Sequence, residues 1–365
     1  MKFTINQHSL TESISIVQKA ISSRAISKEL EGVLISLENN RLKLTGTDAE
    51  IISIETYKDC NGYEEGSTLV NARLFGDIIR KLPNDLIHIE VKGDRMYIKV
   101  QNSNFELLTH NYKDYPNLPM LEESNSITLS SDTLRKAIKQ TTFAVSLDYN
   151  RRALTGVLFE VKKDEISFVA LDGYRLSIYK EKINSDSEYT AIVPGRALNE
   201  LSKILGDDEE EVKIIFSRNN ISFNLKNTVF YSQLIDGQFF NYEDIIRREH
   251  ASNVIVNRHA FQQSLERAEL LAKEEKANLV KLEFKDNLVK ILSNTELGSV
   301  EESVVVENDG IDQLIAFNSR YLLEGIKNMD DAEIKCQLMD DVNPMIIEGV
   351  ENENYLYLVL PVRLA

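Results

Sequence analysis

Hydrophobic and polar residues follow one recurring order along this 365-residue chain, and that order predicts three copies of a single unit. Each copy opens with a short alternating strand, then a polar residue suited to cap a helix, then apolar residues spaced three and four apart. The openings run from Phe3, Ile127 and Val254, which are separated by 124 and 127 residues. A fixed period of this length indicates a repeated domain.

Two further markers keep the same period. A strand that leads into a helix recurs from Leu69, Ile192 and Ala316. A turn after a strand recurs as LTGTDAE from Leu44, VALDGYR from Val169 and ILSNTEL from Ile291. Just inside the three helices of the first marker stand equivalent arginines: Arg73, Arg196 and Arg320.

The repeats predict an α+β fold of three domains, each with two helices that cover curved antiparallel sheets. Alternating segments between the helices, such as RMYIKV and NISFNLK, are bounded by turn residues and predict roughly eight strands in each copy. The expected domains are residues 1–122, 123–248 and 249–365. The expected helices are residues 9–24, 71–82, 130–147, 194–205, 257–273 and 318–329.

Composition places the chain among packed soluble proteins, with 42% hydrophobic and 27% charged residues and no apolar run long enough to cross a membrane. We read no secretory signal at the start, so we expect a cytoplasmic protein. The two cysteines, Cys60 and Cys336, are too few for a disulfide framework and lack the spacing of a thiolate metal site.

The net charge of −16 argues against nucleic acid as a partner only if the charge is evenly spread. It is not, because the six expected helices hold 15 basic and 7 acidic residues, which leaves 27 basic and 51 acidic residues elsewhere. Lys and Arg are good helix formers, but Glu is equally good and is scarce in these helices, so propensity alone does not explain the sign.

Motifs for chemistry are scarce. The chain has no phosphate-binding loop, no HExxH and no GxSxG, and its five histidines lack metal-ligand spacing. The acidic run 207–211 and the pair at 340–341 are more often solvated loops than cation sites. We therefore expect no catalytic residue, no cofactor and no metal, and a metal-dependent nuclease or phosphatase would need convergent carboxylates that the repeats do not supply.

The threefold unit and several motifs together resemble the bacterial sliding clamps, the beta subunits of DNA polymerase III. The motifs are LTGTDAEI, RRALTGVLFE, ALDGYRLS, FFNYEDI and the C-terminal LPVRL. The resemblance covers the whole chain. It implies a non-catalytic processivity factor, a head-to-tail homodimeric ring whose six domains surround duplex DNA. It also implies protein partners: the DNA polymerase III alpha subunit, the clamp loader and other proteins with a clamp-binding motif, with no membrane.

The physics of such a ring agrees with the charge pattern. Twelve helices side by side at about 10 Å give a diameter of about 38 Å, wide enough for a duplex and water once one helix diameter is subtracted. Helices with net positive charge would face the phosphates, and encirclement allows weak, sequence-independent contacts. Each candidate alone is equally consistent with an ordinary solvated helix charge. The expected DNA-facing residues are Arg24, Arg73, Arg80, Arg135, Lys139, Arg196 and Lys203.

Ring closure would pair the first domain of one subunit with the third domain of the other. By resemblance, Phe105 and Leu107 on an edge strand should meet Leu270 and Leu271 on a helix of the partner. The alternative is that Phe105 and Leu107 fill the core of their own domain.

The resemblance also implies a peptide pocket between the second and third domains. Taken alone, DGYR is equally consistent with a common hairpin turn. Phe240 stands where many relatives have Pro, and Glu243 and Asp244 suggest a narrower and more acidic rim. The implied lining is Leu154, Gly173, Tyr174, Arg175, Leu176, Phe240, Ile245, Pro344, Leu358, Leu360, Pro361, Val362 and Arg363.

One other function class stays open at this point. A repeat scaffold that binds peptides but never encircles DNA would share the pocket and would leave the basic helix faces packed or turned outward. Retention on circular DNA compared with linear DNA separates the two.

Overall fold

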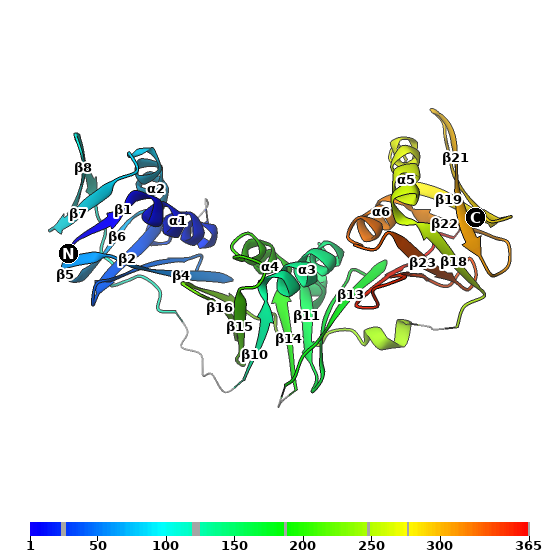
Figure 1. Ribbon diagram of the computed structural model, residues 1–365, viewed down its shortest axis with the longest axis horizontal. Coiled ribbons are helices and arrows are strands. Elements are labelled where there is room, and N and C mark those ends of the chain that lie inside the picture. The colour runs from blue at the N-terminus through cyan, green and yellow to red at the C-terminus, as the bar shows by residue number, and fades with distance from the viewer. Residues whose placement is uncertain (23–26, 119–124, 186–187, 247–248, 276, 364–365) are drawn as a thin grey trace. The chain divides into compact units, whose positions relative to one another are not determined.

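The computed structural model describes residues 1–22, 27–118, 125–185, 188–246, 249–275 and 277–363 (Figure 1). Its three copies follow one order: a strand, a helix, further strands, a second helix and three strands. The first copy differs by one additional short strand, β5. It comprises β1 (Lys2–Asn6), α1 (Gln7–Val17), β2 (Gly32–Glu38), β3 (Arg41–Thr47), β4 (Ile52–Asp59), β5 (Asn61–Glu64), β6 (Gly66–Asn71), α2 (Ala72–Lys81), β7 (Leu86–Lys92), β8 (Arg95–Val100) and β9 (Ser103–Leu108).

The second and third copies each have eight strands within the described residues. The second comprises β10 (Ser126–Ser130), α3 (Ser131–Thr141), β11 (Gly156–Val161), β12 (Glu165–Leu171), β13 (Arg175–Lys182), β14 (Tyr189–Pro194), α4 (Gly195–Ser202), β15 (Glu211–Phe216), β16 (Asn220–Leu225) and β17 (Thr228–Gln233). The third comprises β18 (Ser252–Asn257), α5 (Arg258–Ala272), β19 (Leu279–Lys285), β20 (Leu288–Thr295), β21 (Gly298–Asn308), β22 (Gln313–Asn318), α6 (Ser319–Lys327), β23 (Glu333–Leu338), β24 (Met345–Gly349) and β25 (Tyr355–Val359).

Asparagine side chains cap four of the helices, namely α1, α2, α5 and α6. Asn71 accepts the N–H of Leu74 at 2.9 Å, and Asn257 accepts the N–H of Ala260 at 3.0 Å. Such caps satisfy N–H groups that the first turn leaves without partners. The predicted helix 9–24 is misplaced, because α1 begins at Gln7 and ends at Val17. The predicted helix 130–147 is too long, because α3 ends at Thr141, whose hydroxyl donates back to the carbonyl of Ala137.

Contacts divide the chain into two compact units, which we describe separately. The first unit holds residues 1–135 and 196–234, and the second holds 136–195 and 235–365. In the first unit, β5-β1-β7-β8-β9 form one sheet and β10-β15-β16-β17-β4-β3-β2-β6 form another. The second unit contains one twelve-stranded sheet, β14-β11-β12-β13-β25-β24-β23-β18-β21-β20-β19-β22.

Strand pairs between copies build the two larger sheets. In the first unit, β17 of the second copy pairs antiparallel with β4 of the first, with Phe230 opposite Ile54. In the second unit, β25 of the third copy pairs antiparallel with β13 of the second, with Tyr357 opposite Ser177. Both joints use the last strand of one copy and the third strand after the first helix of the preceding copy.

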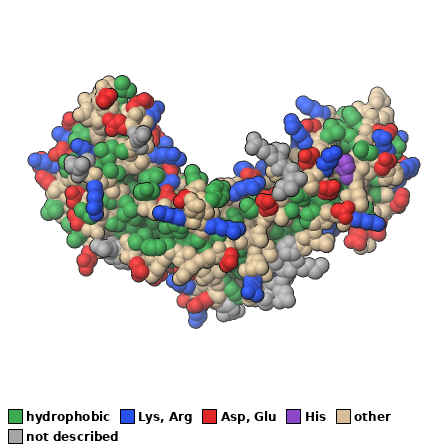
Figure 2. All heavy atoms as spheres, turned by 180° about the vertical axis from the view of Figure 1, so that it is seen from behind, with side chains coloured by type: hydrophobic (Ala, Val, Ile, Leu, Met, Phe, Trp, Pro, Cys, Tyr) green, Lys and Arg blue, Asp and Glu red, His purple; other side chains and the backbone are tan. Residues whose placement is uncertain are grey.

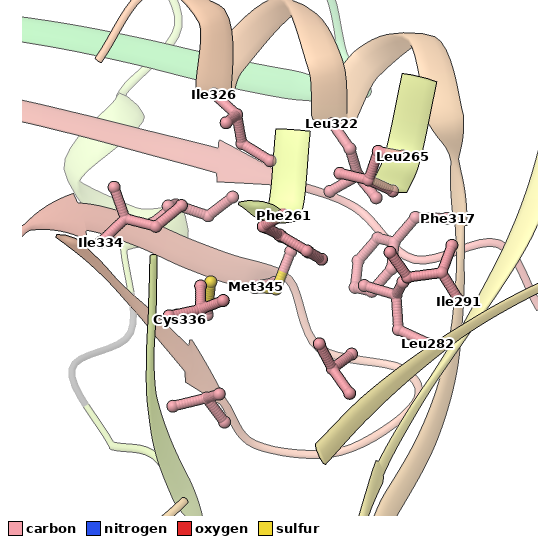
Figure 3. Packing of buried hydrophobic residues seen from close by; sticks show 14 of the residues in the cluster. Phe261, Leu265, Leu282, Ile291, Phe317, Leu322, Ile326, Ile334, Cys336 and Met345 are labelled. Atoms are coloured by element: carbon pink, nitrogen blue, oxygen red, sulfur yellow. The ribbon is translucent and has the colours of Figure 1, made fainter. Parts of the chain in front are cut away.

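The third copy shows how the core is built (Figure 3). The helices α5 and α6 pack together and bury Phe261, Leu265, Leu322 and Ile326 against the sheet. Each fully buried side chain of this size stabilises the fold by about 1.5–3 kcal/mol. The sheet contributes Leu282, Ile291, Phe317, Ile334, Cys336 and Met345 to this cluster.

Among the described residues, no helix combines the length and the apolar character needed to cross a lipid bilayer. Residues 122 and 248, after which we predicted the domain boundaries, lie outside the described ranges, so these boundaries stay predictions.

Candidate functional site

A cavity of about 400 Å³ opens in the second unit. Its walls are the turn between β12 and β13, the end of β25, the connecting segment that contains Phe240 and Ile245, and the loop that contains Pro344. Beneath it lies an apolar cluster in which Leu176 of β13 stands opposite Leu358 of β25. The cavity therefore has a preformed apolar floor, as sites for small apolar anchors commonly do.

The turn between β12 and β13 is held by Asp172. Its Oδ1 accepts the N–H of Tyr174 at 2.9 Å and of Arg175 at 3.2 Å. Gly173 has φ +97°, in the left-handed region that favours glycine, and a Cβ there would lie 2.9 Å from Nη1 of Arg151. The backbone conformation therefore favours glycine at this position, whereas the flexible end of Arg151 can move aside for a Cβ.

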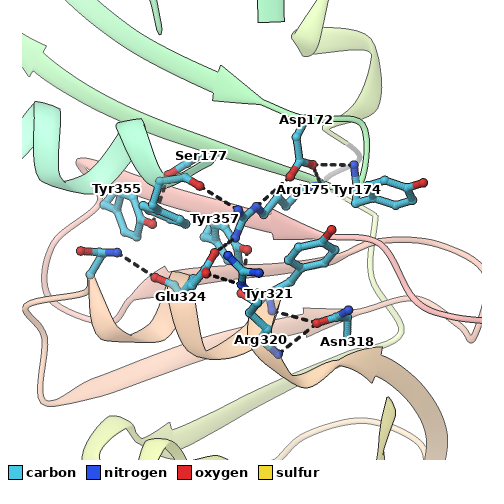
Figure 4. A network of polar contacts seen from close by, with 12 residues as sticks. Asp172, Tyr174, Arg175, Ser177, Asn318, Arg320, Tyr321, Glu324, Tyr355 and Tyr357 are labelled. Atoms are coloured by element: carbon cyan, nitrogen blue, oxygen red, sulfur yellow. Dashed lines mark hydrogen bonds and ion pairs between the residues drawn. The ribbon is translucent and has the colours of Figure 1, made fainter. Parts of the chain in front are cut away.

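Arg175 anchors the turn to the third copy (Figure 4). Its Nε donates to Asp172 at 3.0 Å, one guanidinium nitrogen donates to Glu324 of α6, and the other donates to the carbonyl of Phe143 at 2.7 Å. Burial alone would raise the pKa of Glu324, but hydrogen bonds from Arg320 and Arg175 hold it below its ordinary value. The buried guanidinium is thus fully engaged within the protein.

Tyr174 stands at the mouth of the cavity with 60% of its surface exposed. Its ring stacks on Tyr321 at 6.0 Å, and its carbonyl accepts the N–H of Leu360 at 2.9 Å. The backbone bond fixes the end of β25 beside the turn. Together these contacts position one exposed aromatic ring above the apolar floor.

Most of the expected pocket residues come together here. Four do not line the cavity: Leu176 is buried beneath it, while Pro361, Val362 and Arg363 lie beyond it, because the Val362 N–H donates to Ala316 on β22. The nine that line it are Leu154, Gly173, Tyr174, Arg175, Phe240, Ile245, Pro344, Leu358 and Leu360.

Three lining residues lie outside the expected set: Arg151, Leu171 and Asn343. Asp244, which the sequence placed at the rim, also lines the cavity. Leu171 directly precedes the Asp172 turn, and Arg151 belongs to the same RRALTG segment as Leu154, so extending each motif by a few residues would have found both. Asn343 has no such signal in the sequence.

The expected interface residues are accessible in the chain. Phe105 lies on β9, an edge strand, and 40% of its surface is exposed, while Leu107 is half-buried. Leu270 on α5 is 61% exposed and Leu271 is half-buried. Phe105 therefore does not fill the core of its own copy.

The expected DNA-facing residues are less free than the sequence suggests. Acidic and basic side chains are interspersed over the face seen in Figure 2. Arg73 is exposed and has no ion pair among the described residues, and Arg24 lies outside the described ranges. The other five hold acidic partners: Arg80 with Asp77, Arg135 with Asp208, Lys139 with Asp330, Arg196 with Asp48 and Lys203 with Glu200.

No group of three or more His, Cys, Asp or Glu side chains is placed to hold a metal ion in the described part of the chain.

The buried hydroxyl of Tyr357 donates to the carbonyl of Tyr321 at 2.8 Å, and burial raises the pKa of Tyr357 well above its ordinary value. This hydroxyl therefore stays neutral and ties β25 to α6.

Comparison with known proteins covers the whole chain. Models of the DNA polymerase III beta subunit match in order: the N-terminal domain at residues 1–119, the central domain at 128–241 and the C-terminal domain at 243–363. The beta sliding clamps of Bacillus subtilis (strain 168) and Halalkalibacterium halodurans are 36% and 33% identical to it, each with full coverage of both chains.

Solved structures agree with the sequence matches. The DNA polymerase sliding clamp of Bacillus subtilis superposes with a TM-score of 0.96 at 35% identity, and that of Pseudomonas aeruginosa bound to griselimycin with 0.95 at 30% identity. Both comparisons cover all of both chains. On this evidence the chain belongs to the DNA polymerase III beta subunit family, the DNA sliding clamps.

Proposed function

We propose that two copies of this clamp close head to tail into a ring around duplex DNA, with β9 of one copy paired to β21 of the other. Strand pairing within the chain carries this proposal. At two joints, the last strand of one copy pairs with a strand of the preceding copy, namely the third strand after its first helix. These pairs are β17 with β4 and β25 with β13. Among the described strands, β9 and β21 hold the same two positions without such a partner.

Equivalent backbone hydrogen bonds align the three last strands. In each copy the acceptor lies on the strand directly before the second helix. The N–H groups of His110, Ile235 and Val362 donate to the carbonyls of Leu69, Ile192 and Ala316, respectively. Five residues before these donors stand Phe105, Phe230 and Tyr357.

Phe105 is the exception among these three aromatic residues. Phe230 and Tyr357 are both 0% exposed, whereas Phe105 is 40% exposed. Val305 on β21 and Leu270 on α5 are also exposed, at 75% and 61%. Apolar groups on an edge strand are a liability unless another strand covers them, and pairing of β9 with β21 would do so.

We further propose that the cavity near Tyr174 tethers the DNA polymerase III alpha subunit, the clamp loader and other proteins through short peptide segments. The apolar floor suits one or two buried anchor side chains of an extended peptide. The open ring of Tyr174 offers an additional apolar contact. Tethering needs no covalent step, so this role is non-catalytic.

Retention on DNA would come from encirclement, with weak contacts from the basic helix residues. Five of the seven expected contacts already hold an acidic partner, which lowers their attraction for phosphate. Weak and sequence-independent contacts permit sliding. A cytoplasmic location and domains of residues 1–122, 123–248 and 249–365 belong to the same proposal, and the family matches support the three domains.

Retention on circular DNA tests the ring. The clamp is loaded onto nicked circular duplex, isolated by gel filtration, and then followed after a single restriction cut. We expect stable retention on the circle and release from the linear product, because the ring slides off the ends. Equal retention on both forms would contradict encirclement and favour a scaffold that only binds peptides.

A further inference from the structure

A second cavity, of about 270 Å³, lies in the first unit beside the joint between β4 and β17. This joint is the internal counterpart of the β13–β25 joint that holds the peptide pocket. We propose that the second cavity is a further peptide site, which takes an extended, polar segment that carries a Lys or Arg. The inference rests on the proposed use of the first pocket as a peptide site.

The same turn forms one wall of each cavity. Asp48 Oδ1 accepts the N–H groups of Ile51 and Ile52 at 2.8 and 2.9 Å, as Asp172 accepts those of the turn after β12. Ala49, the residue after Asp48, has φ +61°, in the left-handed region that Gly173 also occupies. Ala49 and Ile51 line the second cavity.

The segment that connects one copy to the next forms a second wall. It follows β9 at the second cavity and β17 at the first pocket. Tyr115 and Tyr242 are the buried tyrosines of these two segments. Two and three residues after Tyr115, Asn117 and Leu118 line the second cavity. Two and three residues after Tyr242, the corresponding positions line the first pocket.

The last strand of the following copy forms a third wall, β17 for the second cavity and β25 for the first. The Gln233 N–H donates to the carbonyl of Ile51 at 2.9 Å, as the Leu360 N–H donates to Tyr174. Gln233 and Tyr231 line the second cavity where Leu360 and Leu358 line the first. Three walls are therefore repeated with different side chains, and two of them, the turn and the last strand, keep equivalent hydrogen bonds to the backbone.

These substitutions decide the chemistry of the occupant. Tyr231 and Gln233 replace two leucines, and Thr47 at the end of β3 corresponds to Leu171 at the end of β12, so this lining is more polar than that of the first pocket. The hydroxyls of Thr47 and Tyr231 are bonded within the protein, so the exposed amide of Gln233 is the side-chain group that faces an occupant. Glu50 at the rim is exposed and has no ion pair among the described residues. A polar peptide would find backbone and side-chain partners here, and a basic residue would be attracted to Glu50.

Selection of random hexapeptides displayed on phage, carried out on the full-length clamp, tests this proposal. Each selected clone is then measured on Glu50→Lys, on the neutral variant Glu50→Gln, and on Leu360→Asp, which alters only the first pocket. We expect one class rich in Lys or Arg that loses at least tenfold in affinity on Glu50→Lys, loses less on Glu50→Gln and is unchanged on Leu360→Asp.

The other outcomes are distinguishable. If every clone depends on Leu360 and none on Glu50, the second site is wrong and the first pocket stands. If the class that depends on Glu50 appears and no clone depends on Leu360, the second site stands and the first pocket fails. If no clone depends on either residue, both proposals are wrong. Glu50 is exposed, so its substitution should preserve the fold, and equal thermal unfolding of the Glu50 variants and the unaltered clamp checks this.

Discussion

The guanidinium of Arg175 lies over the ring of Tyr321, with 4.6 Å between its Cζ and the ring centroid. Tyr174 stacks on the same ring, so one aromatic side chain of α6 contacts both the last residue of the turn and Arg175, the first residue of β13. A cation over an aromatic face contributes about 0.5–2 kcal/mol, more when desolvated. The mouth of the cavity is therefore anchored by a helix of another copy.

Replacement of Arg175 with Lys should destabilise the second unit and weaken peptide binding. A lysine has no planar fork, so it cannot bond Asp172, Glu324 and the carbonyl of Phe143 together. Leaving partly buried carboxylates without their partner should cost about 2–4 kcal/mol. Urea unfolding measures the loss, and Arg152→Lys, at an exposed position, is the matched control and should change stability by less than about 0.5 kcal/mol.

Acid should weaken the same network through Glu324. Its pKa in the folded protein lies below the ordinary value of 4.5, so its stabilisation is complete above that value and is lost as the pH falls through the folded pKa. The difference in unfolding free energy between the clamp and Glu324→Gln should therefore narrow as the pH falls from 6 to below 4.5. A difference that stays constant or widens would show that the ionised carboxylate is not the stabilising form.

Gly325 provides a packing prediction. It lies in α6, and a Cβ at this position would collide with the fully buried ring of Tyr357, whose hydroxyl is fixed to Tyr321. Alanine favours helices by about 1 kcal/mol over glycine, but overpacking costs about 1–3 kcal/mol and the ring cannot move outward. The difference between these two contributions is a loss of up to about 2 kcal/mol in unfolding free energy for Gly325→Ala.

A double-mutant cycle checks the cause. Combining Gly325→Ala with Tyr357→Leu should cost less than the sum of the two single changes, because the smaller side chain admits the new methyl group. Strict additivity would mean that the two residues do not interact.

The repeated pattern predicted the order of strands and helices because it is local. Asn71 and Asn257 precede apolar residues at helical spacing, and a cap acts within three residues. The turn at Asp172 likewise depends on its own hydrogen bonds with the next residues. Local signals of this kind could be found without a structure.

Contacts between segments that are distant in the sequence could not be predicted without a structure. Arg175 was expected only to line the pocket, yet its guanidinium bonds Glu324, 149 residues away in the sequence. Arg196 was expected to face DNA, but it pairs with Asp48, which comes from a turn in another copy. Charge counts on helices miss such pairs because the acidic partners lie on strands and loops whose positions depend on the sheet joints.

The edge strand β9 gives a prediction for ring closure. Phe105→Arg should weaken the dimer at least tenfold, because it places a charge where an apolar side chain would be covered. Tyr63→Arg is the matched control, since Tyr63 is exposed on β5 at the opposite edge of the same sheet. Sedimentation over a range of concentrations measures both, and equal dissociation of the two variants would contradict the proposed joint.

The two arginines with the most different surroundings test how the helices meet DNA. Arg73 is exposed without an ion pair among the described residues, whereas Arg135 donates to Asp208 and to the carbonyl of Gly206, each at 2.6 Å. A cation that already neutralises a carboxylate releases no counterion from DNA when it approaches a phosphate. The affinity falls as salt rises, so the slope of log affinity against log salt is negative. We therefore expect Arg73→Gln to make this slope shallower by about 0.9, and Arg135→Gln to leave it unchanged. Fluorescence anisotropy of a short labelled duplex between 25 and 100 mM salt gives the slopes, and equal slopes for both variants would mean that local ion pairing does not select the DNA contacts.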